Sequence, residues 1–564
     1  MGSMPGKRRF SALERQQVLA EMSADKLDLL VIGGGITGAG IAWDAAVRGM
    51  KVGLLEMGDF ASGTSGKSTK LVHGGLRYLK QGEVKLVREV GKERELLHSN
   101  APHIVLPAPM LMPIYKGGTY GYWASSVGLY LYDWLAGVKP NERRRMLGRE
   151  ETIRMEPLLK RDGLIGAGCY YEYRTDDARL TVDIMKTAHA YGAGIVNYAK
   201  ATDFLYEQGR AAGVRCTDER SGKSYEIRAQ KIVNAAGPWV DLLRQKDGSL
   251  YGKKLLLTKG VHLVVDHSRL PIRQAVYFDV PDGRMIFAIP REGKTYIGTT
   301  DTVYEGPIES PGTTKYDRAY LIHAVNAMFP EAGLKESDIE SSWAGLRPLI
   351  GEEGKAPSEI SRKDEIFMSA SGLISIAGGK LTGFRKMAQK VVDSVAAQIK
   401  DEAGLGFPAC STDRIVISGG DKNGFPTFED CRAHLTERGM AIGIDRNTAE
   451  RLVSLYGSNT EHIYREFENA VHSAGETSDE ASVGRQERDP AACILRAEVR
   501  YCVEHEMAAT ATDFLARRTG MLNFDRLRAE REAERVTELM ADMLGWAADE
   551  RARQRRMIDD HLMK

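Results

Sequence analysis

The sequence contains no apolar run long enough to cross a lipid bilayer. A spanning helix needs roughly 18 or more consecutive apolar residues, and no stretch of this chain reaches that length. The N-terminus also lacks the apolar centre of a signal peptide. These absences predict a cytoplasmic protein, and a peripheral contact with the inner face of the cell membrane stays open as an alternative.

Cysteine is scarce, and the sequence has no C-x-x-C pair and no histidine spacing that suits zinc. We therefore expect free, reduced thiols and no bound metal. Charge of one sign is not in excess either, because Lys and Arg number 78 and Asp and Glu number 77. A balanced chain has no general attraction for nucleic acid, so any anion must bind at a local cluster. The six cysteines are Cys169, Cys216, Cys410, Cys431, Cys493 and Cys502.

A short helix is expected from Ser11 to about Met22, directly after the basic residues Lys7, Arg8 and Arg9. A basic amphipathic helix can lie on a membrane surface as a peripheral anchor. The apolar side chains of this segment, however, do not fall on one narrow stripe. The sequence therefore favours a lead-in helix that is solvated or packed against the core.

The first secondary-structure elements form a recognisable βαβ pattern. Asp28 to Ile32 is a short apolar run bounded by glycines, which is typical of a buried parallel strand. A helical stretch from Thr37 to about Arg48 and a second apolar run from Lys51 to Leu55 follow. Together they predict one βαβ unit.

The segment Gly33 to Gly38 fits the pattern G-x-G-x-x-G between the predicted strand and helix. Glycine is needed because the turn is tight and a pyrophosphate must approach the backbone closely. Glu56 ends the second strand, where a carboxylate can accept hydrogen bonds from ribose hydroxyls. The unit predicts a dinucleotide site, and its position near the N-terminus favours FAD over NAD. The contacts expected here come from Gly33, Gly35, Ile36, Thr37, Gly38 and Glu56.

The middle of the chain predicts a second sheet and a return to the first domain. Residues 76–168 lose the βα alternation, and the run LPAPMLMPIY predicts extended, irregular connections. Tyr251 to Thr300 is typical of antiparallel strands separated by turns. Gly372 to Ala377 predicts another strand, and a helix is expected from Thr382 to about Lys400. The first domain is therefore discontinuous in sequence.

From about Cys410 the sequence is helical and charged, and strand signals are rare. Its amphipathic stretches are typical of packed helices, whereas the residues from Asp549 carry mixed charges and are expected to fray. The predicted domains are a lead-in helix (1–23), a discontinuous cofactor domain (24–76, 168–245 and 340–402), a substrate domain (77–167 and 246–339) and a helical C-terminal domain (410–564).

The stretch Ser62 to Tyr78 is dense in Gly, Ser and Thr, which can present backbone and hydroxyl donors to a phosphate or a flavin. With its motif at Lys67 to Leu79, the sequence resembles the FAD-dependent glycerol-3-phosphate dehydrogenase family. The resemblance covers residues 28–400 and extends into the helical region. The further matching motifs are DDARL (176–180), NAAGPW (234–239), KGVHLV (259–264), IGTTD (297–301), GLRPL (345–349), GGKLT (378–382) and LARRT (515–519).

The resemblance implies an α/β protein with a Rossmann-like FAD-binding domain of the glutathione-reductase type, an antiparallel-sheet substrate domain and an all-helical C-terminal domain. It implies oxidation of sn-glycerol 3-phosphate to dihydroxyacetone phosphate, with non-covalent FAD, a quinone as electron acceptor, and a homodimer. Three alternatives stay open: a glycerol-3-phosphate oxidase that makes hydrogen peroxide, an amine or amino-acid oxidase of the same fold, and a flavin-binding scaffold without turnover.

A phosphorylated alcohol needs cations for its phosphate and a base for its hydroxyl proton. Arginine binds phosphate oxygens in a bidentate manner and keeps its charge, so the matched motifs make Arg77, Arg347 and Arg362 the phosphate candidates. Tyr78 is expected to line the same pocket. His262 is the candidate base, because neutral imidazole can accept a proton near neutral pH. Arg347 can instead stabilise the alkoxide that forms beside His262, and both roles stay open.

Lys380 follows two glycines at the start of a predicted helix, where the positive end of the helix faces a ligand. We assign it to stabilising the reduced flavin and contacting substrate. His73 is expected near the flavin without a covalent bond, and Lys67 is an unusual extra cation for the family. The further cofactor contacts implied by the matched motifs are Thr64, Ser65, Ser68, Lys70, Leu71, His73, Gly74, Ala235, Gly237, Trp239, Gly345, Arg347, Gly379, Lys380, Leu381 and Thr382.

Overall fold

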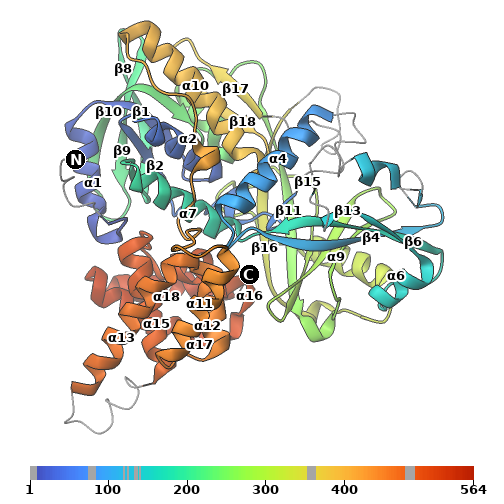
Figure 1. Cartoon of the computed structure of the whole chain (residues 1–564). Coiled ribbons are helices and arrows are strands. Elements are labelled where there is room, and N and C mark those ends of the chain that lie inside the picture. The colour runs from blue at the N-terminus through green and yellow to red at the C-terminus, as the bar shows by residue number, and fades with distance from the viewer. Residues whose placement is uncertain are drawn as a thin grey trace.

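The computed structural model contains two mixed sheets that lie side by side, with a separate group of helices below the first sheet (Figure 1). The N-terminal helix, in blue, and the C-terminal helices, in orange to red, come from opposite ends of the sequence but are neighbours in space (Figure 1). The structure describes residues 9–73, 84–118, 121–122, 126–131, 138, 142–351, 364–476 and 489–563.

The first sheet has a parallel centre, in the order β18, β10, β1, β2 and β7. The βαβ unit predicted at the start of the chain is confirmed, since β1 and β2 pair in parallel on either side of α2 (Ile36–Val47). Strand β17 pairs antiparallel at one edge, and β8 and β9 extend β10 as a hairpin. The strands are β1 (Leu27–Ile32), β2 (Val52–Leu55), β7 (Gly194–Val196), β8 (Ala199–Glu207), β9 (Arg210–Asp218), β10 (Ser224–Asn234), β17 (Asp364–Met368) and β18 (Ile374–Gly378).

Alternate side chains of β1 point to opposite faces of this sheet, because a strand has a period of two residues. Leu29 and Val31 join the apolar cluster of α2, α7 (Asp177–Ala190) and α10 (Phe384–Ala403). Leu30 and Ile32 join a second cluster on the other face. The first sheet is therefore buried on both faces, which explains the continuous apolar run in its sequence.

The lead-in helix α1 (Arg15–Ala24) packs against β7 and β10. Its side chains Val18, Leu19 and Met22 are buried in the second apolar cluster. The buried guanidinium of Arg15 forms an ion pair with Asp218, with Nη2 and Oδ1 2.7 Å apart. The interpretation as a core-packed helix is thus confirmed for the described part of this segment.

The second sheet is largely antiparallel, and its order runs β15, β11, β14, β13, β12, β4, β6 and β3. Strand β16 pairs with β11, and β5 pairs with β6. The antiparallel strands predicted between Tyr251 and Thr300 are confirmed. The strands are β3 (Leu71–Val72), β4 (Leu106–Tyr115), β5 (Arg145–Gly148), β6 (Leu164–Arg174), β11 (Leu255–Asp266), β12 (Ala275–Asp279), β13 (Met285–Arg291), β14 (Lys294–Gly298), β15 (Thr302–Val303) and β16 (Ile339–Ile350).

The prediction of irregular connections at LPAPMLMPIY is wrong, because these residues form β4, a regular strand paired with β6. Proline is tolerated in a strand where its missing N–H faces no partner. Strand β12 reaches β4 only at Met110 and Leu111. The prolines at 107, 109 and 113 therefore lie outside the part of β4 that has partners on both sides.

The strand membership differs from the predicted domain limits at three places. Strands β3, β6 and β16 belong to the second sheet, whereas the sequence predicts the residues of β3, most of β6 and nearly all of β16 in the cofactor domain. The reason is geometric: β6 must pair with β4, and β16 must pair with β11 along most of its length. The chain therefore crosses between the sheets near the ends of these strands.

The region after Cys410 is helical, as predicted, and contains no strand among its described residues. The prediction of fraying from Asp549 is wrong, since α18 continues to Leu562 and buries Gln554, Ile558 and Leu562. Apolar contact with α17 outweighs the charged composition of this helix. The helices of the region after Cys410 are α11 (Phe428–Ala441), α12 (Arg446–Tyr456), α13 (Thr460–Glu476), α15 (Pro490–His505), α16 (Met521–Phe524), α17 (Arg526–Leu544) and α18 (Ala548–Leu562).

Over the described ranges, every helix is too short or too polar to span a membrane. All six cysteines carry free thiols. The remaining helices are α4 (Val84–Asn100), α6 (Arg149–Met155), α8 (Val240–Lys246) and α9 (Lys315–Met328).

Candidate active site

The glycine turn after β1 has the geometry of a dinucleotide site. Gly33 has a φ of +118°, and a Cβ there would lie 2.5 Å from the carbonyl oxygen of Ala235. A Cβ at Gly38 would overlap the carbonyl oxygen of Gly33, one turn back along the chain. Only glycine permits both the left-handed turn and the close approach of α2 to β1.

Glu56 lies at the end of β2 beside this turn. Its Oε2 accepts a hydrogen bond of 2.6 Å from the Gly34 N–H, and its Oε1 accepts one of 2.7 Å from the Gly58 N–H. Burial raises the pKa of Glu56, while the hydrogen bonds from Gly58 and Gly34 oppose that rise. The side chain is thereby fixed with its carboxylate at the wall of a cavity.

This cavity, which we call the cofactor cavity, has a volume of about 240 Å³ and lies at the carboxyl ends of the parallel strands. Ligands of open α/β sheets bind at this position. The N-terminus of α2 opens onto it, and the Ser65 hydroxyl accepts a hydrogen bond of 2.8 Å from the Ile36 N–H. Its walls are mainly glycine, alanine, serine and aliphatic residues, so a dinucleotide such as FAD fits the groups present.

A second cavity of about 350 Å³ adjoins the first; we call it the substrate cavity. It is lined by strands of the second sheet, by residues 64–73 and by the loop after β18, and the two cavities share part of their lining. The shared residues are Thr64, Pro348, Gly379, Lys380 and Leu381.

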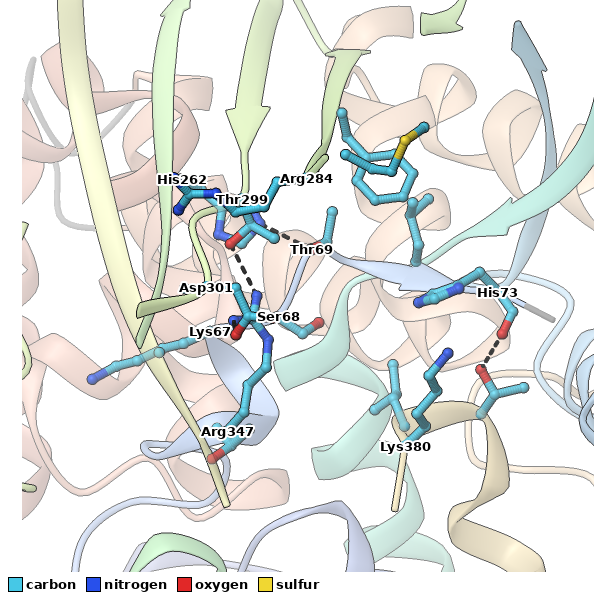
Figure 2. Close-up of a pocket in the computed structure, with 18 of the residues that line it drawn as sticks. Lys67, Ser68, Thr69, His73, His262, Arg284, Thr299, Asp301, Arg347 and Lys380 are labelled. Carbon is cyan, nitrogen blue, oxygen red and sulfur yellow. Dashed lines mark hydrogen bonds and ion pairs between the residues drawn. The ribbon is translucent and has the colours of Figure 1, made fainter. Parts of the chain in front are cut away.

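His262 lies in the middle of β11 and borders the substrate cavity (Figure 2). Its side chain is buried, with 1% exposure, and its ring stacks on Trp343 with centroids 4.8 Å apart. Its Nε2 lies 3.0 Å from Thr69 Oγ1. Across the strand pair, Gly298 leaves the space for the ring, because a Cβ there would overlap the imidazole. The ring is thus held on one face by Trp343, along one edge by the backbone at Gly298, and at Nε2 by Thr69.

The protonation state of His262 follows from its surroundings. Burial, together with the positive charges of Arg347 and Lys70, lowers the pKa of His262 well below its usual value. The ring is therefore neutral at physiological pH and can accept a proton.

Arg347 extends from β16 beside this histidine (Figure 2). Its Nη2 donates a hydrogen bond of 3.0 Å to Thr299 Oγ1, and its Nη1 donates one of 3.1 Å to the Thr300 carbonyl. Nη1 also lies 3.3 Å from Asp301 Oδ1. A Cβ at Gly260 would overlap the guanidinium, so this glycine of β11 leaves the space that the group occupies. The group is oriented by three partners and remains at the cavity wall.

Lys380 lies on the loop between β18 and α10, at the border of the two cavities. The preceding glycines, Gly378 and Gly379, have φ values of +77° and +80°. The loop is tied to the opposite wall, because Thr382 Oγ1 donates a hydrogen bond of 3.1 Å to the His73 carbonyl. Figure 2 shows Lys380 and His73 on the other side of the cavity from His262 and Arg347.

Most of the predicted site residues that the structure describes are brought together here. Gly38 and Lys70 border neither cavity: Gly38 acts in packing, and the Lys70 ammonium forms a buried ion pair of 2.5 Å with Asp177. Gly74, Arg77, Tyr78 and Arg362 lie outside the described residues. The predicted residues that border a cavity are Gly33, Gly35, Ile36, Thr37, Glu56, Thr64, Ser65, Ser68, Leu71, His73, Ala235, Gly237, Trp239, His262, Gly345, Arg347, Gly379, Lys380, Leu381 and Thr382.

The structure adds residues that the sequence did not assign. Thr69, Thr299 and Asp301 lie inside motifs quoted for the family resemblance, but nothing in the motifs shows that their side chains meet His262 or Arg347. Arg284 comes from the turn between β12 and β13, where no motif points to it. Lys67, noted as an unusual cation, also borders the substrate cavity.

Comparison with protein-family models gives two matches. Residues 28–384 match the family described as "FAD dependent oxidoreductase". Residues 410–551 match the "C-terminal domain of alpha-glycerophosphate oxidase". The second match begins where the helical region begins.

Similar curated proteins and solved structures cover nearly the whole chain. The aerobic glycerol-3-phosphate dehydrogenase of Bacillus subtilis (strain 168) is 54% identical over 547 residues, 97% of this chain and 96% of that protein. The enzyme of the same name from Staphylococcus haemolyticus (strain JCSC1435) is 51% identical, over 95% of this chain and 94% of its own. The crystal structure of glycerol-3-phosphate dehydrogenase from Bacillus halodurans, complexed with FAD, is 46% identical with a TM-score of 0.82 and covers 98% of each chain.

A more distant structure shares the fold alone. The FAD-bound L-alpha-glycerophosphate oxidase from Mycoplasma pneumoniae is 17% identical, with a TM-score of 0.54, over 69% of this chain and 97% of its own.

Proposed function

Since the chain belongs to the family of FAD-dependent aerobic glycerol-3-phosphate dehydrogenases, we propose that it oxidises sn-glycerol 3-phosphate to dihydroxyacetone phosphate. FAD, bound without a covalent link, supplies the hydride acceptor, and a quinone takes the electrons. The single observation that carries this proposal is the position of His262, Arg347 and Lys380 around one cavity that adjoins the cofactor cavity and shares part of its lining.

The cations of the substrate cavity suit a phosphorylated substrate. Lys67, Arg284, Arg347 and Lys380 border it, together with the acidic residues Glu172, Asp282 and Asp301. Arg347 holds its guanidinium in a fixed orientation at the cavity wall, where its permanent positive charge suits a phosphate oxygen or the alcohol oxygen. Arg77, Tyr78 and Arg362 stay predictions as further substrate contacts.

His262 is the proposed base for the alcohol proton. The ring is neutral and fixed, and its Nε2 faces the Thr69 hydroxyl at the cavity wall. A proton from the substrate can therefore reach Nε2 through the Thr69 hydroxyl, which passes its own proton to Nε2 as it accepts the proton of the substrate. Arg347 stabilises the negative charge that develops on the substrate oxygen as this proton leaves.

Lys380 places its positive charge where the two cavities meet. There it contacts the substrate and offsets negative charge that develops at the cofactor end of the site. The hydrogen bond from Thr382 to His73 ties the loop that carries Lys380 to the opposite wall.

Anaerobic addition of glycerol 3-phosphate to the purified flavoprotein tests the substrate assignment. The long-wavelength flavin band should bleach, whereas glycerol at the same concentration should leave it unchanged because it has no phosphate for the cations to bind. A flavin band that stays unbleached with glycerol 3-phosphate contradicts the proposal.

The electron acceptor needs its own experiment. Substrate-reduced enzyme should be reoxidised much faster by a soluble quinone analogue than by oxygen. Fast reoxidation by oxygen with an equal yield of hydrogen peroxide would make the protein an oxidase instead. A homodimer and a peripheral contact with the inner membrane face are part of the proposal by family resemblance; light scattering and vesicle sedimentation test them.

A further inference from the structure

A buried carboxylate joins the cofactor cavity to the helical C-terminal region. Asp59 is 1% exposed and lies in residues 57–66, the segment after β2, which we call the cofactor loop. Its Oδ2 accepts hydrogen bonds of 2.7 Å from Arg518 Nη1 and 2.5 Å from Arg517 Nε. Its Oδ1 accepts bonds of 2.9 Å from Arg518 Nη2 and 3.0 Å from Asn197. All four hydrogen-bonding positions of a carboxylate are used.

On the side that faces away from the helical region, the cofactor loop forms one wall of the cofactor cavity. The cavity-lining residues of the loop are Met57, Ala61, Ser62, Gly63, Thr64 and Ser65. The loop is also tied to the glycine turn, because the Ala61 N–H donates a hydrogen bond of 3.0 Å to the Gly34 carbonyl. A displacement of Asp59 would therefore move groups that shape the dinucleotide site.

The backbone of the cofactor loop is strained. Ala61, two residues after Asp59, has a φ of +59°, a conformation that disfavours residues with a side chain. Such conformations persist only where the surrounding structure holds them. Two residues before this strained position, the ion pairs of Asp59 with Arg517 and Arg518 hold the loop.

Both arginines come from the helical region, on a π-helical turn from Asp513 to Arg518. Arg518 is fully buried, and its Nη2 also donates a hydrogen bond of 2.9 Å to the Glu506 carbonyl. Arg517 pairs with Asp513 on the same turn, at 2.6 Å. Figure 1 shows this region directly below the sheet that carries the cofactor loop.

The charges of this cluster depend on each other. Burial alone raises the pKa of Asp59, but the guanidinium groups of Arg518 and Arg517 outweigh it and hold the pKa well below its usual value. Removal of one member leaves an uncompensated charge in the interior, which costs far more than the loss of a surface pair. The cluster therefore either keeps all its contacts or rearranges.

We propose that the helical C-terminal region clamps the cofactor loop through Asp59, Arg517 and Arg518, and that these three are positioning residues for FAD. The region thus contributes to cofactor retention although none of its described residues borders the cofactor cavity. This inference rests on the FAD assignment of the proposed function and is independent of the substrate.

Replacement of the cluster in the full-length protein tests the clamp. Asp59→Asn removes the charge, and Arg517→Ala removes the more exposed cation, whose side chain is 15% exposed, so that the second variant is the milder one. The matched control is Glu498→Gln, which disrupts a buried bidentate pair with Arg451 at 2.8 and 2.7 Å inside the helical region. For each variant, the Kd of FAD is measured on apoprotein by fluorescence quenching, well below the unfolding temperature.

Coupling between contacting groups changes equilibrium constants by roughly 2- to 150-fold, so Asp59→Asn should raise the Kd of FAD by about tenfold or more. Arg517→Ala should raise it by a smaller factor, and Glu498→Gln should leave it within about twofold although its unfolding temperature falls. At saturating FAD, the KM for glycerol 3-phosphate should stay at the wild-type value in all three.

Two results would overturn the clamp: a wild-type Kd of FAD in folded Asp59→Asn and Arg517→Ala, or an equal loss of FAD affinity in Glu498→Gln. If Asp59→Asn does not fold, the Kd of FAD is compared between Arg517→Ala and Glu498→Gln. A larger Kd in Arg517→Ala supports the clamp, and equal Kd values contradict it. A wild-type protein that binds no FAD refutes the proposed function itself and is thereby distinguished from failure of the clamp.

Discussion

The imidazole of His262 lies flat against the indole of Trp343, with ring centroids 4.8 Å apart and an angle of 13° between the planes. The indole covers one face of the ring, and the contact of 3.0 Å with Thr69 Oγ1 holds Nε2 in the ring plane. The residues that fix the ring come from three strands or loops that are distant in sequence. The imidazole is therefore oriented by β14 and β16 of the second sheet and by Thr69 in the segment before β3.

Replacement of His262 by Asn should lower kcat by roughly 100- to 10,000-fold, the range for loss of a general base. FAD binding should be unaffected, because the ring borders the substrate cavity and not the cofactor cavity. Steady-state kinetics with a quinone analogue and the flavin spectrum of the purified variant check this. A variant that keeps wild-type kcat would remove His262 from the chemistry.

The same substitution should change the pH dependence of stability. The pKa of His262 in the folded protein lies well below its ordinary value of 6.5. In the pH range between these two values the unfolded chain binds a proton that the folded chain does not, so wild-type stability falls as the pH decreases. The stabilising contribution is complete above the unfolded pKa and is lost as the pH falls toward the folded pKa.

Thermal unfolding of wild type and His262→Asn, compared at about pH 7.5 and about pH 5.5, measures this effect. The free energy of unfolding of the wild type, taken relative to that of His262→Asn, should be smaller at the lower pH than at the higher pH. Three other histidines with lowered pKa, His103, His462 and His505, are present in both proteins and cancel in the comparison. A difference that does not vary with pH contradicts a buried neutral His262.

The sequence predicted elements with a strong period or a specific turn, and it missed those that depend on partners. The unit from β1 to β2 was predictable because both faces are apolar and the turn needs Gly33 and Gly38. Strand β4 was missed because its prolines contradict a strand unless the position of β12 is known. Helix α18 was missed because its stabilising contact is with α17 and is not visible in its own composition.

The candidate site shows the same limit at the level of side chains. The family motifs supplied His262, Arg347 and Lys380, which border one cavity. The partner of His262 was not predictable, because Thr69 is 193 positions away in the sequence and is one of several hydroxyl residues in its segment. Nor could Lys70 be separated from the site residues before its ion pair with Asp177 was known.

Thr69→Val should lower kcat by about tenfold, since it removes the hydroxyl at Nε2 of His262 and leaves a buried nitrogen without its hydrogen bond. Thr69→Ser keeps the hydroxyl and is the matched control, for which near-wild-type kcat is expected. FAD content should be equal in both variants. Equal activity of the Val and Ser variants would show that the hydroxyl has no part in the reaction.

Arg347→Lys keeps the positive charge but loses the fork that binds Thr299, Thr300 and Asp301. We expect kcat/KM for glycerol 3-phosphate to fall by roughly 10- to 150-fold, the value of one hydrogen bond to a charged group. The flavin content should remain close to that of the wild type. If FAD is lost in proportion to activity, Arg347 has a structural role instead.

Gly298→Ala tests whether free space beside His262 is needed for activity. A Cβ at position 298 would overlap the imidazole, which is held by Trp343 and cannot move away without breaking the stack. The ring should therefore shift from Thr69, with a fall in kcat of about tenfold or more, because small misplacements of a catalytic group are costly. Gly148→Ala is the control in the same sheet, since a Cβ there has no neighbour within 4 Å. Kinetics and FAD content of both variants decide the question: equal activities would mean that the ring tolerates the added methyl group, and that its position is not set by the strand pair.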